Sequence, residues 1–106
     1  MTIYIFYEIV CNDPNIKENY VGQTKNFRSR KYQHKSNCNH MKREDGTQRK
    51  IYDFINKNGG WNNWTMRPLE ERTCITHTRA LIREQYWINE KKAALNREPT
   101  KAEQNM

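Results

Sequence analysis

The sequence has few apolar residues and lacks long hydrophobic runs. Only 35% of its 106 residues are hydrophobic, and no stretch approaches the roughly 20 apolar residues that a membrane-spanning helix needs. The apolar start at residues 3–10 is interrupted by Glu8, which is typical of a β-strand rather than of a cleavable signal peptide. The chain therefore predicts one small intracellular domain, cytoplasmic or nuclear, with a modest core.

Cysteines are few as well. Cys11, Cys38 and Cys74 are widely spaced and odd in number, so a disulfide framework is not expected, as in proteins of reducing compartments. Cys38 and His40 are close enough for half of a zinc site, but the chain has no Cys-x-x-Cys or His-x-x-x-His pair to complete it. We interpret these residues as buried thiols and loop residues.

Acidic residues are scarce in one third of the chain. Residues 17–50 hold ten lysines and arginines against three acids, a net charge of +7, whereas the remainder holds nine basic and nine acidic residues. A clustered basic surface is the electrostatic signature of a phosphate-rich partner. A solvated basic face that only aids solubility is the alternative. The sequence also has no Asp-x-Asp motif or comparable acidic cluster at a plausible site, which argues against a hydrolase with two metal ions.

β-Branched and aromatic residues dominate 3–10 and predict the first strand. Side chains alternate between the faces of a strand, so Tyr7 should lie on the opposite face to Tyr4. A second strand would pair antiparallel with the first and bring Tyr7 and Tyr20 to the same end of a small sheet. Tyrosines in strands most often serve packing, and that interpretation stays open for both.

The remaining elements complete a small mixed domain. Pro68 cannot donate to a strand ladder, so the third strand should be an edge. Helical periodicity predicts the helices, the last of them capped by Thr78, and a polar loop is expected at 37–46. We expect an α+β fold with a three-stranded antiparallel sheet flanked by about three helices: strands at 3–10, 19–23 and 64–70, and helices at 27–36, 51–58 and 79–90.

Large aromatic side chains could either stack on bases or build the core. Trp61 and Trp64 favour the core, because a domain this small needs its large apolar side chains to fold; base stacking is the alternative. Phe27 and Tyr32 are expected to anchor the first helix.

The stretch from 20 to 34 combines a strand, a turn and a helix. Gly22 is expected to permit a tight bend, and Thr24 and Asn26, which are residue types that often cap helices, follow it. Within the helix, Arg30 and His34 are four residues apart and therefore share a face. This face carries a fixed cation and a titratable imidazole beside Tyr20.

One carboxylate of the last helix lies where apolar residues are expected. Leu81, Trp87 and Ile88 define an inward stripe, and Glu84 falls in its middle. Burying a lone carboxylate is unfavourable unless something pairs with it. The alternatives are a salt bridge to an arginine, a helix rotated enough for Glu84 to reach solvent, and a metal ligand at the floor of a site.

Together these residues resemble the signature of the GIY-YIG nuclease family. Ile5-Phe6-Tyr7 resembles the first triplet, with Ile5 in place of its glycine and Phe6 in place of its isoleucine, and Tyr20-Val21-Gly22 resembles the second. The resemblance covers nearly the whole chain and implies a nuclease domain at 1–98 with a polar tail at 99–106. The matching positions, in the family's order, are Tyr7, Tyr20, Gly22, Arg30, His34, Glu84 and Asn96.

The resemblance implies a Mg²⁺-dependent endonuclease that hydrolyses DNA through a single metal ion and leaves a 5′-phosphate and a 3′-hydroxyl. Glu84 would bind Mg²⁺ (or Mn²⁺). Arg30 would contact a phosphate oxygen with a fork geometry that lysine lacks. Tyr7, its pKa lowered by the metal and nearby cations, would act as general base.

The other matching residues would support the reaction. Tyr20 would position the water or the phosphate, His34 would relay a proton or bind phosphate, and Asn96 would steady the site. Basic residues around them are expected to contact the DNA backbone, which sets register and salt dependence: Lys25, Arg28, Lys31, Lys35, Lys42 and Arg43.

A different class of function stays open. The departure at Ile5 and Phe6 leaves room for a non-catalytic DNA- or RNA-binding module of the same fold. A structural interaction domain would explain neither the charge segregation nor Glu84. The sequence does not decide between a monomer and a homodimer, which bases are read, or whether the chain is of viral or mobile-element origin.

Overall fold

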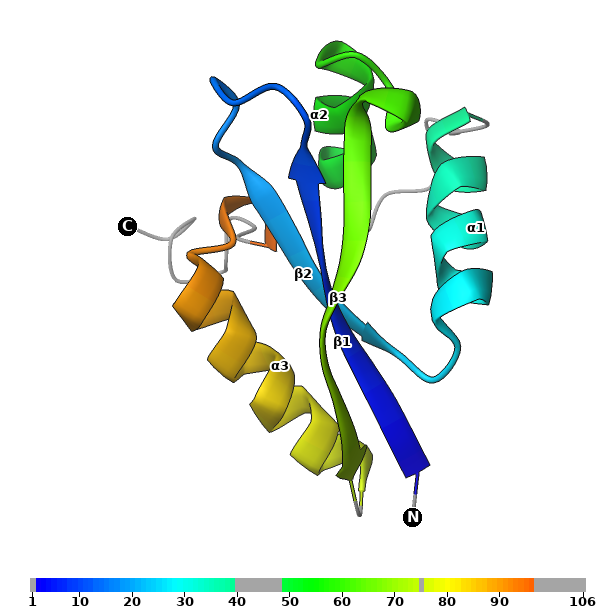
Figure 1. Ribbon diagram of the computed structural model, residues 1–106, viewed down its shortest axis with the longest axis vertical. Helices are drawn as coiled ribbons and strands as arrows, with labels where there is room; N and C mark the ends of the chain where they lie inside the picture. The colour runs from blue at the N-terminus through cyan, green and yellow to red at the C-terminus, as the bar shows by residue number, and fades with distance from the viewer. Residues whose placement is uncertain (1, 40–48, 75, 97–106) are drawn as a thin grey trace, which may run out of the picture.

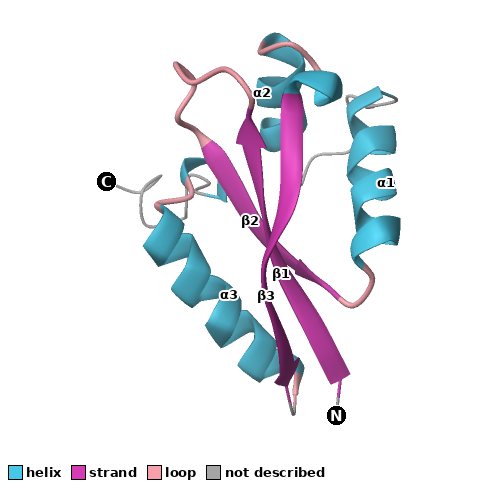
Figure 2. Ribbon diagram, viewed as in Figure 1, coloured by secondary structure: helices cyan, strands magenta, loops and turns pink. Residues whose placement is uncertain are grey.

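The computed structural model describes residues 2–39, 49–74 and 76–96, and it confirms the predicted α+β fold. Three antiparallel strands form one sheet, with three α-helices packed around it (Figures 1 and 2). Every helix in these ranges is too short or too polar to cross a bilayer, and the predicted tail at 99–106 lies outside them. In chain order the elements are β1 (Thr2–Cys11), β2 (Asn19–Thr24), α1 (Phe27–Asn39), α2 (Arg49–Lys57), β3 (Trp64–Cys74) and α3 (His77–Lys91), with 3₁₀ turns at Trp61–Asn63 and Ala94–Asn96.

β1 is the central strand, and β2 and β3 form the two edges of the sheet. Pro68 lies on β3, so its missing donor falls on an edge strand, as predicted. The register shifts beside it, between Phe6 and Tyr7 of β1. β3 continues well beyond the predicted end at residue 70, because its charged second half still pairs with the start of β1.

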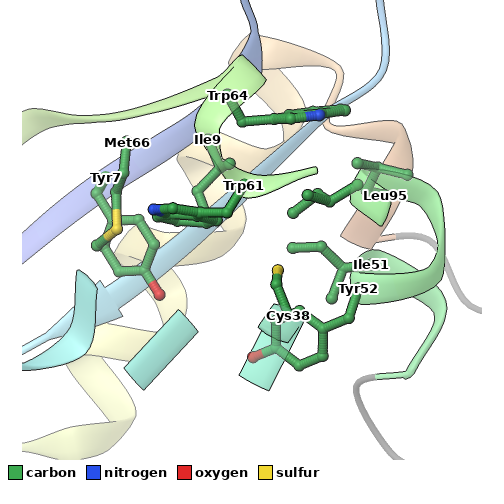
Figure 3. Close-up of a cluster of buried hydrophobic side chains, with 10 residues drawn as sticks. Tyr7, Ile9, Cys38, Ile51, Tyr52, Trp61, Trp64, Met66 and Leu95 are labelled. Atoms are coloured by element: carbon green, nitrogen blue, oxygen red, sulfur yellow. The ribbon is translucent and has the colours of Figure 1, made fainter. Parts of the chain in front are cut away.

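The larger core fills the space between the sheet, α1 and α2 (Figure 3). Trp61 and Trp64 are 8% and 5% exposed, so both tryptophans belong to the core, as expected. The three cysteines of the chain are free thiols. The buried members of this core are Tyr7, Ile9, Cys38, Ile51, Tyr52, Ile55, Trp61, Trp64, Met66 and Leu95.

α3 covers the opposite face of the sheet, where a smaller apolar cluster forms. Tyr4 and Phe6 of β1 pack there against Ala80, with Trp87 beside them. The sequence pattern predicts that Leu81 also points inward, but Leu81 is 45% exposed, and that prediction is wrong. The helix is rotated so that Ala80 faces the sheet.

Polar contacts fix α3 at two points along its length. Glu70 on β3 accepts hydrogen bonds from Arg83 Nε at 2.7 Å and from Trp87 Nε1 at 3.0 Å. The Arg83 guanidinium lowers the pKa of Glu70 to about 2. Nearer the end of the helix, Asn19 Nδ2 of β2 donates to the backbone oxygen of Lys91 at 3.1 Å. These contacts hold the middle of α3 against β3 and its C-terminal end against β2.

The caps of two helices differ in how well they follow the sequence. Asn26, one of two capping residues before α1, accepts a hydrogen bond from Ser29 N at 3.0 Å. The cap of α3 is Thr76, whose Oγ1 accepts from Arg79 N at 3.2 Å. The predicted cap Thr78 is wrong, because that residue already lies in the first turn.

α1 is longer and less firmly anchored than predicted. It extends into the expected polar loop at 37–46, and the rest of that loop lies outside the described residues. Tyr32 is 71% exposed, so the prediction that it anchors the helix is wrong. Phe27 does pack inward, edge-on to Tyr7 with ring centroids 6.3 Å apart. The other inward residue of note is the polar His34, which is fully buried.

Candidate active site

A glycine in β2 makes room for the tyrosine at the centre of the site. Gly22 pairs with Tyr7 of β1. A Cβ added to Gly22 would lie 2.5 Å from Tyr7 Cζ and closer still to Tyr7 Oη. The predicted tight bend at Gly22 is wrong, because β2 runs straight through it to Thr24. Glycine is needed here so that the phenol can lie across the backbone of β2.

The Tyr7 phenol begins a chain of buried hydrogen bonds. Tyr7 Oη lies 2.8 Å from His34 Nε2, and His34 Nδ1 lies 3.0 Å from Tyr52 Oη. Asn37 Nδ2 donates to the same Tyr52 oxygen at 3.0 Å. Burial, helped by the nearby Arg30 charge, lowers the pKa of His34 to about 3. His34 is therefore a neutral imidazole behind Tyr7, a place from which it can exchange a proton but cannot contact a phosphate.

Burial also controls the two tyrosines. It raises the pKa of Tyr7 to about 12, against a smaller lowering effect from the Arg30 hydrogen bond. It raises the pKa of Tyr20 as well. In the protein by itself Arg30 does not lower the pKa of Tyr7 below its usual range, because desolvation of the phenolate outweighs the Arg30 charge. Both phenols are protonated at neutral pH.

Arg30 stands between Tyr7 and the solvent. Its Nε donates to Tyr7 Oη at 3.4 Å, which is a long hydrogen bond. Its Nη1 donates to Gln33 Oε1, one turn further along α1. The guanidinium is half-buried, so it is partly exposed to a ligand that enters beside α1.

Glu84 reaches the same place from α3. Tyr7, Tyr20, Arg30 and Glu84 all border one cavity of about 420 Å³. Within the described part of the chain, nothing forms a hydrogen bond or an ion pair with the half-buried Glu84 carboxylate. Burial raises its pKa, and the Arg30 charge lowers it by less. The salt-bridge alternative from the sequence therefore does not apply, and the carboxylate faces the cavity. The remaining lining residues are Tyr4, Gln23, Thr24, Lys25, His77 and Leu81.

Asn96 lies outside the cavity and holds β2 from its free edge. Its Oδ1 accepts from Val21 N at 2.7 Å, and its Nδ2 donates to Val21 O at 2.7 Å. Val21 sits between Tyr20 and Gly22, so these two bonds position the strand that carries both.

The basic residues expected to contact nucleic acid fall into three groups. Lys25 lines the cavity. Arg28, Lys31 and Lys35 are exposed at helical spacing along α1, and so form one stripe on its outer surface. Lys42 and Arg43 lie outside the described residues.

Three residues of this site were not predicted from the sequence. His77 lines the cavity about two turns before Glu84 on the same helix face, and that spacing was visible in the sequence. Tyr52 and Asn37 close the hydrogen-bond chain behind His34. Asn37 follows His34 by three residues on α1, whereas nothing local distinguishes Tyr52 from an ordinary core aromatic.

Comparison with protein families decides the relationship. Residues 1–98 match the model of the GIY-YIG catalytic domain. The chain belongs to the GIY-YIG family. GIY-YIG domains are nuclease domains, and a nucleic acid is therefore the substrate class that this membership implies. Searches of curated proteins and of solved structures found no match.

The departures from the GIY-YIG signature lie away from the cavity. Ile5, in place of the first glycine, pairs with Thr24 in the sheet. Phe6, in place of the isoleucine, is fully buried in the cluster under α3. Neither residue lines the cavity. Phe6 packs on the α3 side, whereas Ile5 borders a separate hollow with Phe27 and Pro68, so neither side chain forms part of the cavity lining around Tyr7.

Proposed function

We propose that this GIY-YIG chain is a Mg²⁺- or Mn²⁺-dependent endonuclease that hydrolyses DNA. The observation that carries the proposal is the Glu84 carboxylate, which faces the cavity opposite Arg30 without a partner among the described residues. Holding a desolvated carboxylate in this way is unfavourable unless a cation offsets it. A module that only binds nucleic acid has no need for such a group in a cavity that otherwise carries Lys25 and Arg30.

The donor set suits a hard divalent cation that keeps most of its water. Over the described residues, no group of three or more His, Cys, Asp or Glu side chains gathers at one place. Glu84 would be the protein ligand, with water and a substrate phosphate completing the coordination, which is how Mg²⁺ is commonly bound. When bound, the ion would polarise the phosphate and neutralise charge on the leaving oxygen.

Arg30 is best placed to hold the phosphate and to open access to Tyr7. Tyr7 is fully buried in the protein alone, and Arg30, whose Nε lies 3.4 Å from Tyr7 Oη, is one of the residues that shield it from solvent. A guanidinium prefers a phosphate oxygen, which it can grip with two parallel hydrogen bonds. Turning towards the phosphate would therefore expose Tyr7 Oη to the attacking water.

Tyr7 would accept the proton of the water while passing its own proton to His34. The phenol is protonated at neutral pH because burial raises its pKa to about 12, and His34 Nε2 is 2.8 Å away. The water oxygen bonds to phosphorus, the P–O3′ bond breaks, and the 3′ oxygen takes a proton from solvent. His34 then returns its proton to Tyr7 Oη, and Tyr7 releases the proton taken from the water into the opened cavity. The products are a 5′-phosphate and a 3′-hydroxyl.

Cleavage of supercoiled plasmid in Mg²⁺, in Mn²⁺ and in EDTA tests the proposal. We expect nicking only with a divalent ion and 5′-phosphates at the mapped ends. Glu84→Gln should lower the rate by about a hundredfold or more while DNA binding in EDTA stays close to wild type. Glu90→Gln, an exposed acid on the same helix, is the matched control and should cleave normally.

Two results would overturn the proposal. If Glu84→Gln cleaves as fast as wild type, Glu84 is not the ligand of the catalytic metal. A wild-type protein that binds DNA but cleaves neither DNA nor RNA with either ion would instead favour the non-catalytic binding module. Cleavage of RNA alone would correct the substrate class.

A further inference from the structure

A lysine and a histidine border the cavity away from Glu84. Lys25, in the turn after β2, has its Nζ 5.8 Å from the centre of the Tyr4 ring. The His77 ring, in the first turn of α3, has its centroid 6.3 Å from that of Tyr4. All three residues line the cavity that holds Arg30 and Glu84. Tyr4 is only 5% exposed, so it supports the two groups rather than offering a face for stacking.

These groups are not neutralised by a carboxylate. Among the described residues, no acid forms an ion pair or a hydrogen bond with Lys25 or His77. Both side chains are exposed. Among the described residues that line the cavity, Glu84 is the single acid, and it follows His77 by seven residues. Seven residues of α-helix span about 10 Å, so this end of the cavity is well separated from the carboxylate.

The separation decides which phosphate these groups could bind. Phosphates of one DNA strand are spaced by about 3.4 Å along the duplex axis. A separation of about 10 Å along α3 therefore favours different phosphates for Glu84 and His77. It matches a phosphate a few nucleotides away on the same strand.

We propose that Lys25 and His77 form a second phosphate subsite, which holds a flanking phosphodiester of the strand being cut. The inference rests on the proposed function, because it takes Arg30 and Glu84 to mark the scissile phosphate. The subsite sets where along the strand the scissile phosphate comes to rest. It is a positioning device, and it acts on substrate affinity rather than on the chemical step.

Salt dependence of binding tests the subsite without any cleavage. A 20-base-pair duplex is titrated in EDTA over a range of NaCl concentrations. Lys25→Ala should lower the slope of log K against log[NaCl] by about one unit, the value for one lost phosphate contact. His77→Gln should weaken binding, and His77→Lys should restore it. Lys57→Ala on α2, an exposed lysine far from the cavity, is the matched control for the position of the charge.

A substrate with one neutral linkage tests the position. A methylphosphonate is moved one step at a time away from the mapped cut on the cleaved strand. At one flanking position the methylphosphonate should raise KM as much as Lys25→Ala does, with kcat unchanged. Combined with Lys25→Ala, it should raise KM no further than either change alone. Melting temperatures of the variants should stay within about 4 °C of wild type, because both side chains are exposed.

Three results would overturn the subsite. The first is an unchanged salt slope in Lys25→Ala. The second is that the losses from Lys25→Ala and from the methylphosphonate add at every position. The third is a fall in kcat with KM unchanged in His77→Gln, which would place His77 in the chemical step. If the wild type cleaves nothing, the proposed function fails, and the salt slope still reports whether these residues hold a phosphate.

Discussion

Gly22→Ala tests the close packing on which the site is built. The new methyl carbon would lie 2.5 Å from Tyr7 Cζ, inside the separation of about 3.5–4.0 Å at which carbon atoms pack. Either the Tyr7 ring or β2 must therefore move by about 1 Å. The ring has little freedom, because it is fully buried and its centroid lies 6.3 Å from that of Phe27, 6.5 Å from that of Tyr20 and 5.7 Å from that of His34.

The expected cost is that of overpacking a core. We expect Gly22→Ala to lower the free energy of unfolding by about 1–3 kcal/mol. Alanine in place of glycine would otherwise be favourable within a strand, by roughly 0.5–1 kcal/mol. The sign of the effect therefore separates a steric clash from a backbone preference.

Denaturant unfolding of four proteins isolates the clash. The set is wild type, Gly22→Ala, Tyr7→Leu and the double variant, followed by circular dichroism. Leucine lacks the Cζ and Oη atoms that the methyl would meet, so in that background Gly22→Ala should cost less than about 0.5 kcal/mol. Equal losses in both backgrounds would refute the reasoning, since the phenol would then not lie over Gly22.

Three further substitutions test other parts of the site. Arg30→Ala should lower kcat/KM by about a hundredfold, as when one transition-state donor is lost; a loss below tenfold would place Arg30 outside the chemistry. The pKa of His34 is lowered to about 3 in the folded protein. Between about pH 6.5 and pH 3, His34 therefore binds a proton in the unfolded chain but not in the folded protein. The free energy of unfolding is highest above about pH 6.5 and falls as the pH drops towards 3. Unfolding experiments between pH 6 and pH 4 should show wild type losing up to about 1.4 kcal/mol per pH unit more than His34→Gln, and parallel curves would contradict this. Asn96→Ala removes two hydrogen bonds to Val21 and should cost about 1–3 kcal/mol of unfolding free energy; an intact stability with an activity loss as large as that of Arg30→Ala would mean that Asn96 contacts substrate.

The fold could be predicted because strands and helices leave different patterns in the sequence. The β-branched and aromatic residues at 3–10 indicate a strand, which the structure buries on both faces, and helical spacing around Ile55 indicates one buried face of a helix. Glu84 could be singled out for the opposite reason, because a carboxylate within an apolar pattern conflicts with burial. The structure resolves that conflict by turning Ala80 towards the sheet, so that Glu84 and the partly exposed Leu81 both border the cavity.

The missed features depend on contacts between distant parts of the chain. Whether Gly22 serves a bend or a close approach depends on which residue of β1 lies opposite it. The pKa of Tyr7 depends on how deeply the ring is buried, which no local pattern encodes. The seven-residue spacing from His77 to Glu84 is visible in the sequence. The packing of His77 beside the Tyr4 ring, which distinguishes this histidine from an ordinary exposed one, is visible only in the structure.

The position of the site at the β2 edge follows from the need to join the two faces of the sheet. Tyr7 and Arg30 lie on the side covered by α1 and α2, whereas Glu84 comes from α3 on the opposite side. Side chains from opposite faces can meet only around an edge strand, so β2 must keep one edge free of further strands. Asn96 satisfies the exposed N–H and C=O of Val21 on that edge, in the way that a neighbouring strand would. Gly22, which has no side chain, then lets the Tyr7 phenol reach across β2 towards Glu84. Gly22 and the Asn96 amide together allow residues from both covered faces of the sheet to border one cavity.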